Sequence, residues 1–450
     1  MSSKYKIESL RFFDPETSQY GANFSTMIDE ISISESIDFP GTRATITVTD
    51  SLGLYTQIKG NEYIQLNFRL PDLSQSKTYF LAVYRVGPII RLEKRAKYNI
   101  ECISQETVMN ELSYVLSSFK NKKVSEIINE LLTKGDYMKV DKNKKLHIEE
   151  TKDKFQCVIP GWRVYDAINW LGSKSIRNNS KDSSTPQSGF VFYENYDGLH
   201  FKSFDKIIED ALNFKEYTDK SNNPIKWLKY RYHPKKQSAD SVDLGIIESV
   251  TYPDVFDHLS PIRNGSYAGL YTSIALDVIP NSKMSTPKNT QMPYQGKQFN
   301  VNSMFDKQNH LGTINPYKGT KNPVYNRVKR NRLRPNQIHN WDLPEKEVKL
   351  ESGVIQQRAE ETAIYTHCRK ITFEAIKLQI RVAGNVTFHV GNPITIEIPK
   401  MLANDGKIEM DDIYTGVYII AGVRHKIGGD VIHTELMLVK DSLGSAIPKS

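Results

Sequence analysis

Cysteine is scarce in this chain of 450 residues. Only three cysteines occur, Cys102, Cys157 and Cys368, and they lie far apart in the sequence. An odd, widely spaced set forms no disulfide framework and has none of the spacings that bind zinc. We therefore expect three reduced thiols that face the core, and a chain that folds in a reducing cytoplasm.

Long apolar runs are absent as well. No stretch approaches the roughly 18–20 apolar residues that a membrane-spanning helix needs, and the polar start Met1–Lys6 leads into no apolar segment of a secretion signal. We therefore expect no membrane insertion. The net charge of +8 is mild for this length, and it does not by itself indicate a nucleic-acid-binding protein, which usually carries a concentrated basic patch.

Catalytic motifs are missing too. The sequence has no glycine-rich phosphate loop, no zinc-binding His-Glu helix motif and no Gly-x-Ser-x-Gly nucleophile elbow. The acidic pairs Glu149-Glu150 and Asp411-Asp412 lie in polar stretches, and we expect solvated loops rather than a glycosidase dyad. His425 and His433 fall on two strands of one predicted hairpin, where a surface or interface pair is favoured over a metal site that would lack a third ligand. We expect no enzyme, no catalytic residue, no cofactor and no metal.

Alternating apolar residues dominate the first part of the chain. Period-two spacing with β-branched and aromatic residues predicts strands, and such spacing occurs at 29–36, 43–50, 63–70, 77–86 and 98–104. Several such strands separated by Gly, Pro and Asp predict an antiparallel β-barrel or sandwich. We assign this first barrel domain to residues 1–106.

The pattern then changes to a mixed one. Apolar residues take helical spacing in Val124–Lys134 and Trp162–Ser173, and alternating strands return around the Asp197-Gly198 turn. These features predict a mixed α/β middle domain over residues 107–244. A chain of this length exceeds the roughly 250–300 residues that one core can organise, so several domains are expected.

The last part of the chain returns to strands with an interruption. Strand patterns over 245–278 and 353–442 predict a second, discontinuous barrel, with a helix at Gly353–Cys368. Residues 279–352 form a polar insertion without periodicity, and 443–450 form a short tail. The predicted fold class is therefore α+β and mainly β, with two similar antiparallel β-barrel domains and a mixed α/β domain.

A weak internal duplication connects the two predicted barrels. Three segments recur in the same order: Gly60–Phe68 with Gly391–Ile398, Tyr79–Val86 with Tyr418–His425, and Asn99–Ser104 with His433–Leu438. Such repetition predicts two copies of one unit in each chain. Three chains around a threefold axis would then place six similar units in a ring, since closed cyclic assembly is the usual route for homo-oligomers.

One basic cluster lies inside the polar insertion. It includes Lys318, Lys321, Arg327, Lys329, Arg330, Arg332 and Arg334, beside Tyr317 and Tyr325. A solvated basic loop and a loop that binds an acidic protein are both compatible with this pattern, and nucleic acid is a third alternative because basic patches with aromatic residues can bind it. We name these residues as a candidate partner-binding loop.

Two parts of the sequence resemble a known family. The run Asp50–Leu66 resembles the first tube-like domain of the central baseplate hub protein of contractile-tailed bacteriophages. The second tube domain of that family is similar to a series of segments near the C-terminus: Gln357–Cys368, Ile371–Phe373, Gly384–Ile394, Val417–Lys426 and Gly429–Ser442.

The resemblance implies a structural role in the virion. Hub proteins of this family form homotrimers whose tube domains make a pseudo-sixfold ring between the sixfold tail tube and the threefold central spike. The implied partners are the central spike protein, tail tube or tube-initiator proteins, the tape measure protein and baseplate wedge proteins, and DNA passes the lumen without specific binding. The implied location is the tail baseplate of a virion assembled in the host cytoplasm. A cell-wall hydrolase of the tail, and the hub of a related contractile injection or type VI secretion device, remain as alternatives.

Overall fold

The computed structural model describes most of the chain. The described residues are 6–70, 75–152, 154–178, 186–214, 217–218, 224–225, 228–232, 245–253, 259–275, 294–318, 330–336, 359–400, 409–429 and 431–444. Within these ranges, no helix is both long enough and apolar enough to span a membrane.

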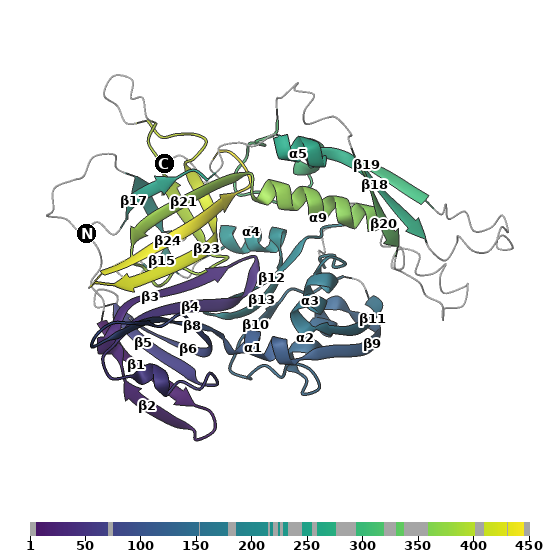
Figure 1. The fold of residues 1–450 in the computed structure, drawn as a ribbon. Helices are drawn as coiled ribbons and strands as arrows, with labels where there is room; N and C mark the ends of the chain where they lie inside the picture. Colours follow the sequence, from purple (N-terminus) through teal and green to yellow (C-terminus); the bar gives the residue numbers. More distant parts are fainter. Residues whose placement is uncertain are drawn as a thin grey trace.

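The N-terminal part forms the first barrel, a strongly twisted antiparallel sheet (Figure 1). Its strands pair in the order β2-β1-β5-β6-β8-β4-β3, and all five predicted strands occur, as β3, β4, β5, β6 and β8. Their alternation is explained by burial, because one side chain in two points into a core that includes Ile33, Ile46, Leu66 and Ile100. The elements are β1 (Lys6–Asp14), β2 (Gln19–Asn23), η1 (Ser25–Met27), β3 (Ile28–Ser36), β4 (Phe39–Asp50), η2 (Leu54–Thr56), β5 (Tyr63–Leu70), β6 (Gln75–Val86), β7 (Ile90–Arg91) and β8 (Ala96–Ser104).

The middle of the chain is a mixed α/β unit. The helical spacing predicted near 124 and 162 corresponds to two helices that bury one apolar face each, among them Ile128, Leu132 and Ile168. They pack beside the β9–β11 pair and the sheet β10-β13-β12. The elements are α1 (Gln105–Leu112), β9 (Tyr114–Lys123), α2 (Val124–Thr133), β10 (Leu146–Ile148), β11 (Lys154–Arg163), α3 (Val164–Gly172), β12 (Phe190–Asn195), β13 (Gly198–Ser203), α4 (Phe204–Leu212), β14 (Tyr217–Thr218) and β15 (Pro224–Ile225).

A second barrel follows, and its strands close into a ring. The pairing order is β16-β22-β23-β24-β21-β17, and β17 pairs back onto β16. Its core includes Ile380, Ile394, Ile396 and Leu436, all essentially inaccessible to solvent. The strands are β16 (Lys229–Tyr232), β17 (Ile246–Thr251), β21 (Ile376–Ala383), β22 (Pro393–Glu397), β23 (Gly416–Gly428) and β24 (Val431–Lys440).

A small sheet and a long helix lie outside this ring. The sheet order is β19-β18-β20, and α9 packs against all three strands (Figure 1). Thus β18, in the range predicted for the second barrel, pairs elsewhere, whereas β16, in the range predicted for the middle domain, belongs to the ring. The elements are α5 (Leu259–Asn264), β18 (Ala268–Ala275), β19 (Tyr294–Asn300), α6 (Val301–Phe305), β20 (Asn331–Asn336) and α9 (Ala359–Phe373).

The two barrels repeat one strand order. The first has β1-β5-β6-β8-β4-β3 and the second has β16-β22-β23-β24-β21-β17, so the recurring sequence segments lie on the corresponding strands β5 and β22, β6 and β23, β8 and β24. The correspondence extends to an ion pair, since Arg85–Glu101 (3.7 Å) in the first barrel is matched by Arg424–Glu435 (3.9 Å) in the second. The predicted fold class, mainly β with two similar barrels and a mixed α/β unit, is confirmed. One difference is that β1 is antiparallel to β5, whereas β16 is parallel to β22.

A buried charged cluster fastens α9 to the middle unit and to the end of β24. The side chain of Arg369 is fully buried, with Nε 3.5 Å from Asp205 and Nη1 3.3 Å from Asp441. Asp441 also contacts Nδ1 of His310 at 2.9 Å, and the Tyr365 hydroxyl donates to Asp205 at 2.9 Å. Burial alone would raise the pKa of Asp441, but the hydrogen bond from His310 and the charge of Arg369 lower it.

Candidate assembly surface: a continuous sheet across both barrels

Strand β3 of the first barrel pairs with β23 of the second. The antiparallel register runs from Ser36 opposite Gly422 to Glu30 opposite Gly428. The strands of both barrels therefore form one continuous hydrogen-bonded sheet (Figure 1). We call the β3–β23 contact the junction.

The inner face of the junction holds a buried polar cluster from three parts of the chain. The Glu35 carboxylate accepts hydrogen bonds from the backbone N–H groups of Tyr196 (3.0 Å) and Val390 (3.3 Å), and it lies 3.3 Å from Nδ1 of His389. Lys77 Nζ lies 2.9 Å from the other ring nitrogen of His389 and 3.7 Å from the centre of the Tyr196 ring. The first barrel, the middle unit and the second barrel are thereby fixed to one another at this point.

The ionisation of Glu35 shows which interaction dominates there. Burial alone would raise its pKa, but the charge of His389 and the hydrogen bond from it outweigh burial and lower the pKa. A buried carboxylate that stays ionised needs its donors, so the cluster resists separation of the three units.

The outer face of the sheet is polar across the strands that flank the junction. A row of directly opposed residues crosses five strands: Arg43, Ser34, Arg424, Glu435 and Arg381. Carboxylates neutralise several of the basic groups, because Lys426 contacts Glu435 at 2.9 Å and Arg381 contacts Glu248 at 3.3 Å. This face therefore presents hydrophilic side chains, among which Arg424 and Lys426 share the carboxylate of Glu435 and Arg381 contacts Glu248.

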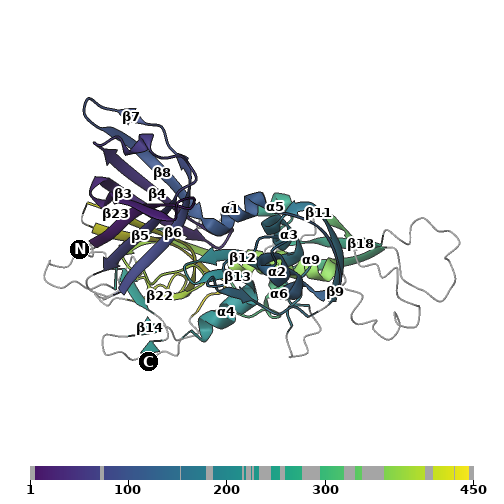
Figure 2. The same cartoon turned by 90° about the horizontal axis from the view of Figure 1, so that it is seen from below.

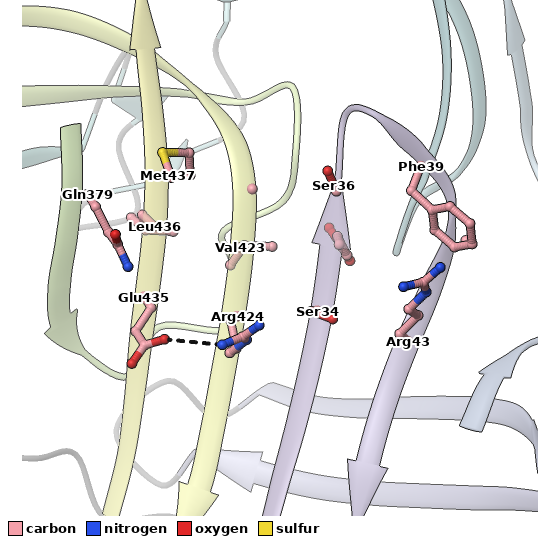
Figure 3. A pocket seen from close by; sticks show the side chains of 13 residues that line it. Ser34, Ser36, Phe39, Arg43, Gln379, Val423, Arg424, Glu435, Leu436 and Met437 are labelled. Atoms are coloured by element: carbon pink, nitrogen blue, oxygen red, sulfur yellow. Dashed lines mark ion pairs between the residues drawn. The ribbon is translucent and has the colours of Figure 1, made fainter. Parts of the chain in front are cut away.

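An open hollow of about 290 Å³ lies on this outer face over the junction (Figure 3). Side chains from β3, β4, β21, β23 and β24 line it, among them Arg43, Gln379 and Met437. The Arg43 guanidinium stacks 3.8 Å from the centre of the Phe39 ring. Two acidic residues belong to the lining: Glu435 is paired with Arg424 (Figure 3), and the carboxylate of Glu35 is held by Tyr196, His389 and Val390 in the buried cluster. The hollow thus offers a polar contact surface rather than a pair of groups for acid–base chemistry.

The basic loop is placed only in part. Lys321, Arg327 and Lys329 lie outside the described residues, and Lys318 and Arg330 are exposed. Arg332, on β20, donates hydrogen bonds to the carbonyls of Asn264 (2.7 Å) and Gly265 (3.2 Å), and Arg334 lies on the same strand. The role of this basic cluster as a partner-binding loop remains a prediction.

Two expectations from the sequence about polar groups were wrong. Glu149 is not solvated, because its carboxylate receives a hydrogen bond from Arg177 Nε at 2.6 Å and both side chains are buried. His425 and His433 do not form a pair. Register places His425 opposite Thr434, with the ring buried and 3.0 Å from the Thr434 hydroxyl, whereas His433 lies one residue along and contacts Glu248 at 3.1 Å. Successive residues of a strand point to opposite faces, which separates the two rings.

Metal ligands and thiols are the remaining groups that could carry chemistry. Among the residues that the structure describes, no three His, Cys, Asp or Glu side chains gather as a metal site. The three cysteines are free and buried, and burial raises the pKa of Cys157 to about 11. The feature that sequence patterns missed is the junction itself, because pairing between distant strands leaves no local periodicity.

Because two histidines are buried, we expect the protein to lose stability in mild acid. Burial lowers the pKa of His425 to about 4 and that of His200 to about 2, so both stay neutral in the folded protein, whereas the unfolded chain takes up protons near pH 6.5. The stability is fully present above about pH 6.5 and is lost as pH falls, by up to about 1.4 kcal/mol per pH unit for each histidine. Urea unfolding at pH 7.5, 6 and 5 measures this slope. His425→Asn should reduce it, and a free energy of unfolding that is flat over this range would contradict the assignment.

Comparisons with known proteins bear on the fold. No family model matches the sequence, and no match was found among curated proteins. Two solved structures are similar over nearly the whole chain. The 43 kDa tail protein of prophage MuSo2 from Shewanella oneidensis is 9% identical with a TM-score of 0.50, and the match covers 97% of this chain and 99% of that one. The tail protein from Neisseria meningitidis MC58 is 10% identical with a TM-score of 0.50 and 97% coverage of each chain.

At this identity the likeness concerns the fold alone. The chain has the fold of these two tail proteins, so the fold that the family resemblance implied is confirmed. The matches cover the middle unit as well as the barrels, so the likeness is to the fold of nearly the whole chain and not to one barrel.

Proposed function

We propose that this protein is a structural hub of a contractile phage tail, which forms a trimeric ring in the baseplate and has no enzymatic activity. The observation that carries the proposal is the repeated strand order of two barrels joined by the junction into one sheet. Two barrels in each chain make six similar barrels in a trimer, and such a ring matches a sixfold tail tube on one side and a threefold spike on the other.

The outer polar face of the continuous sheet is the natural lining of the ring's channel in this proposal. One face of the sheet is already used by the two apolar cores, and the other carries Ser34, Arg424, Glu435 and Arg381. Phosphate binding depends on unpaired Lys and Arg. Ion pairs such as Lys426–Glu435 (2.9 Å) reduce that affinity, so tape measure protein and DNA would pass without being held.

The other partners follow from the same proposal. The ring would contact tail tube or tube-initiator proteins, the central spike protein and baseplate wedge proteins in the virion tail. The polar insertion with its basic loop is the part of the chain that we propose for contact with an acidic neighbour.

Light scattering coupled to size-exclusion chromatography tests the assembly. We expect the purified full-length protein at micromolar concentration to have three times the mass of one chain. A species that stays at the mass of one chain up to tens of micromolar would contradict the ring. Clearance of peptidoglycan by the same preparation would contradict the absence of enzymatic activity.

A further inference from the structure

The geometry points to the two strand edges that close the ring: the outer edge of β17 pairs antiparallel with the distal part of β6 in the next copy of this chain. This inference rests on the proposed trimer and specifies its interface. It follows from the internal repeat, because the junction within one chain already shows how one barrel of this type joins the next.

The junction supplies the template. In it, β3 pairs with the second half of β23, with Ser34 opposite Arg424 and Ile33 opposite His425. The first half of β23 pairs with β22 on the same edge. A strand of the neighbouring barrel therefore takes over the edge where β22 ends.

Each strand of the template has a counterpart in the other barrel. Within the repeat, β23 corresponds to β6, so Arg424 corresponds to Arg85, as their matching ion pairs also indicate. Strand β3 corresponds to β17. This correspondence follows from their partner strands, because β3 pairs with β4 and β17 pairs with β21. Ser34 lies opposite Arg43 of β4, and Thr251 lies opposite Gln379, the residue of β21 that is equivalent to Arg43.

Applying the register of the junction to β17 and β6 predicts which residues lie opposite each other across the interface. Thr251 of one copy lies opposite Arg85 of the next, Val250 opposite Val86, and Ser249 opposite Gly87. Burial agrees with this register: Thr251 and Arg85 are both exposed on the outer face, whereas Val250 and Val86 are both half-buried and pack onto the cores of their own barrels. The two apolar faces would join on one side and the polar faces on the other, as in the junction.

Both edges are available within the described part of the chain. On β6, pairing with β5 ends near Ala82 and the backbone N–H of Val83, and no described strand continues along that edge. On β17, β16 covers only Ile246 and Ile247. The hairpin that carries the end of β6 projects from the barrel (Figure 2) and exposes apolar side chains, with Ile89 44%, Ile90 60% and Leu92 55% accessible. An apolar projecting hairpin with a free edge fits a protein partner.

Disulfide trapping tests the register. We expect the double variant Arg85→Cys, Thr251→Cys to become a covalent trimer under mild oxidation, because each chain contributes one cysteine to each of two interfaces. Opposed residues have Cβ atoms about 4.5–5.5 Å apart, whereas diagonal ones are about 7–8 Å apart. The control Arg85→Cys, Ser249→Cys should therefore cross-link at least tenfold more slowly. The native cysteines are buried and should not interfere.

Two further samples separate the possible failures. Mixing the two single variants should give one linked dimer, which shows that the bond joins different chains, and Ser34→Cys, Arg424→Cys should form the equivalent bond within one chain. A trimer by light scattering that does not link through Arg85→Cys and Thr251→Cys would overturn the proposed edges and leave the proposed function standing. A monomeric protein would overturn both.

Discussion

Ile396→Asp is expected to leave a chain that does not fold and therefore does not assemble. Ile396 lies on β22 with no accessible surface, inside the core of the second barrel. Placing a carboxylate there removes a well-packed side chain and buries a charge without a partner. Together these two effects should lower the free energy of unfolding by on the order of 5 kcal/mol or more, which is much of the stability of a typical domain.

The measurement is urea unfolding followed by circular dichroism, together with the yield of soluble protein. Gln379→Asp is the matched control, because Gln379 is exposed on β21 of the same barrel and should change stability by no more than about 0.5 kcal/mol. Soluble and trimeric Ile396→Asp protein would refute the placement of this face in the core.

Arg369→Met should destabilise the protein by about 3–5 kcal/mol, because it leaves two buried carboxylates without their cationic partner. Arg369, Asp205 and Asp441 all have side chains without accessible surface. Breaking a buried ion pair by removing one partner costs far more than the pair itself contributes. The control Arg381→Met, at a half-buried side chain that loses a contact with Glu248 at 3.3 Å, should cost no more than about 1 kcal/mol.

The pH dependence gives this prediction a second readout. The charge of Arg369 is one of the causes that lower the pKa of Asp441 against the effect of burial, so its removal shifts that pKa upward. The penalty for the buried charge of Asp441 is then complete at neutral pH and shrinks as pH falls through the raised pKa, so the difference in free energy of unfolding between variant and wild type should narrow in acid. The triple variant with Asp205→Asn and Asp441→Asn should recover part of the loss. A gap that is constant with pH would point to packing alone.

Most strands of the barrels were predictable from the sequence, because burial on one face enforces alternation. Strand β1 was not, since a bulge between Ile7 and Ser9 breaks its period. The repeat was visible because its three segments keep their order. The exchange of β16 and β18 between units was not visible, because membership of a sheet depends on pairing between distant segments and not on local pattern.

The candidate site was less predictable than the fold. The polar and apolar faces of β3 and β23 are present in the alternation, but nothing local indicates that these two strands pair with each other. The buried Glu35 and Arg369 clusters were missed for a related reason: a charged residue is expected at the surface unless its partners are known, and here the partners lie more than 70 residues away.

The ring is the central claim, and averaged electron-microscope images of the purified protein test it most directly. We predict a closed ring of six similar lobes with threefold symmetry and an open centre, in which alternate contacts correspond to the junction within a chain and to the β17–β6 contact between chains. Compact particles with the size of one chain and no open centre, at a concentration where the protein is folded, would contradict the account.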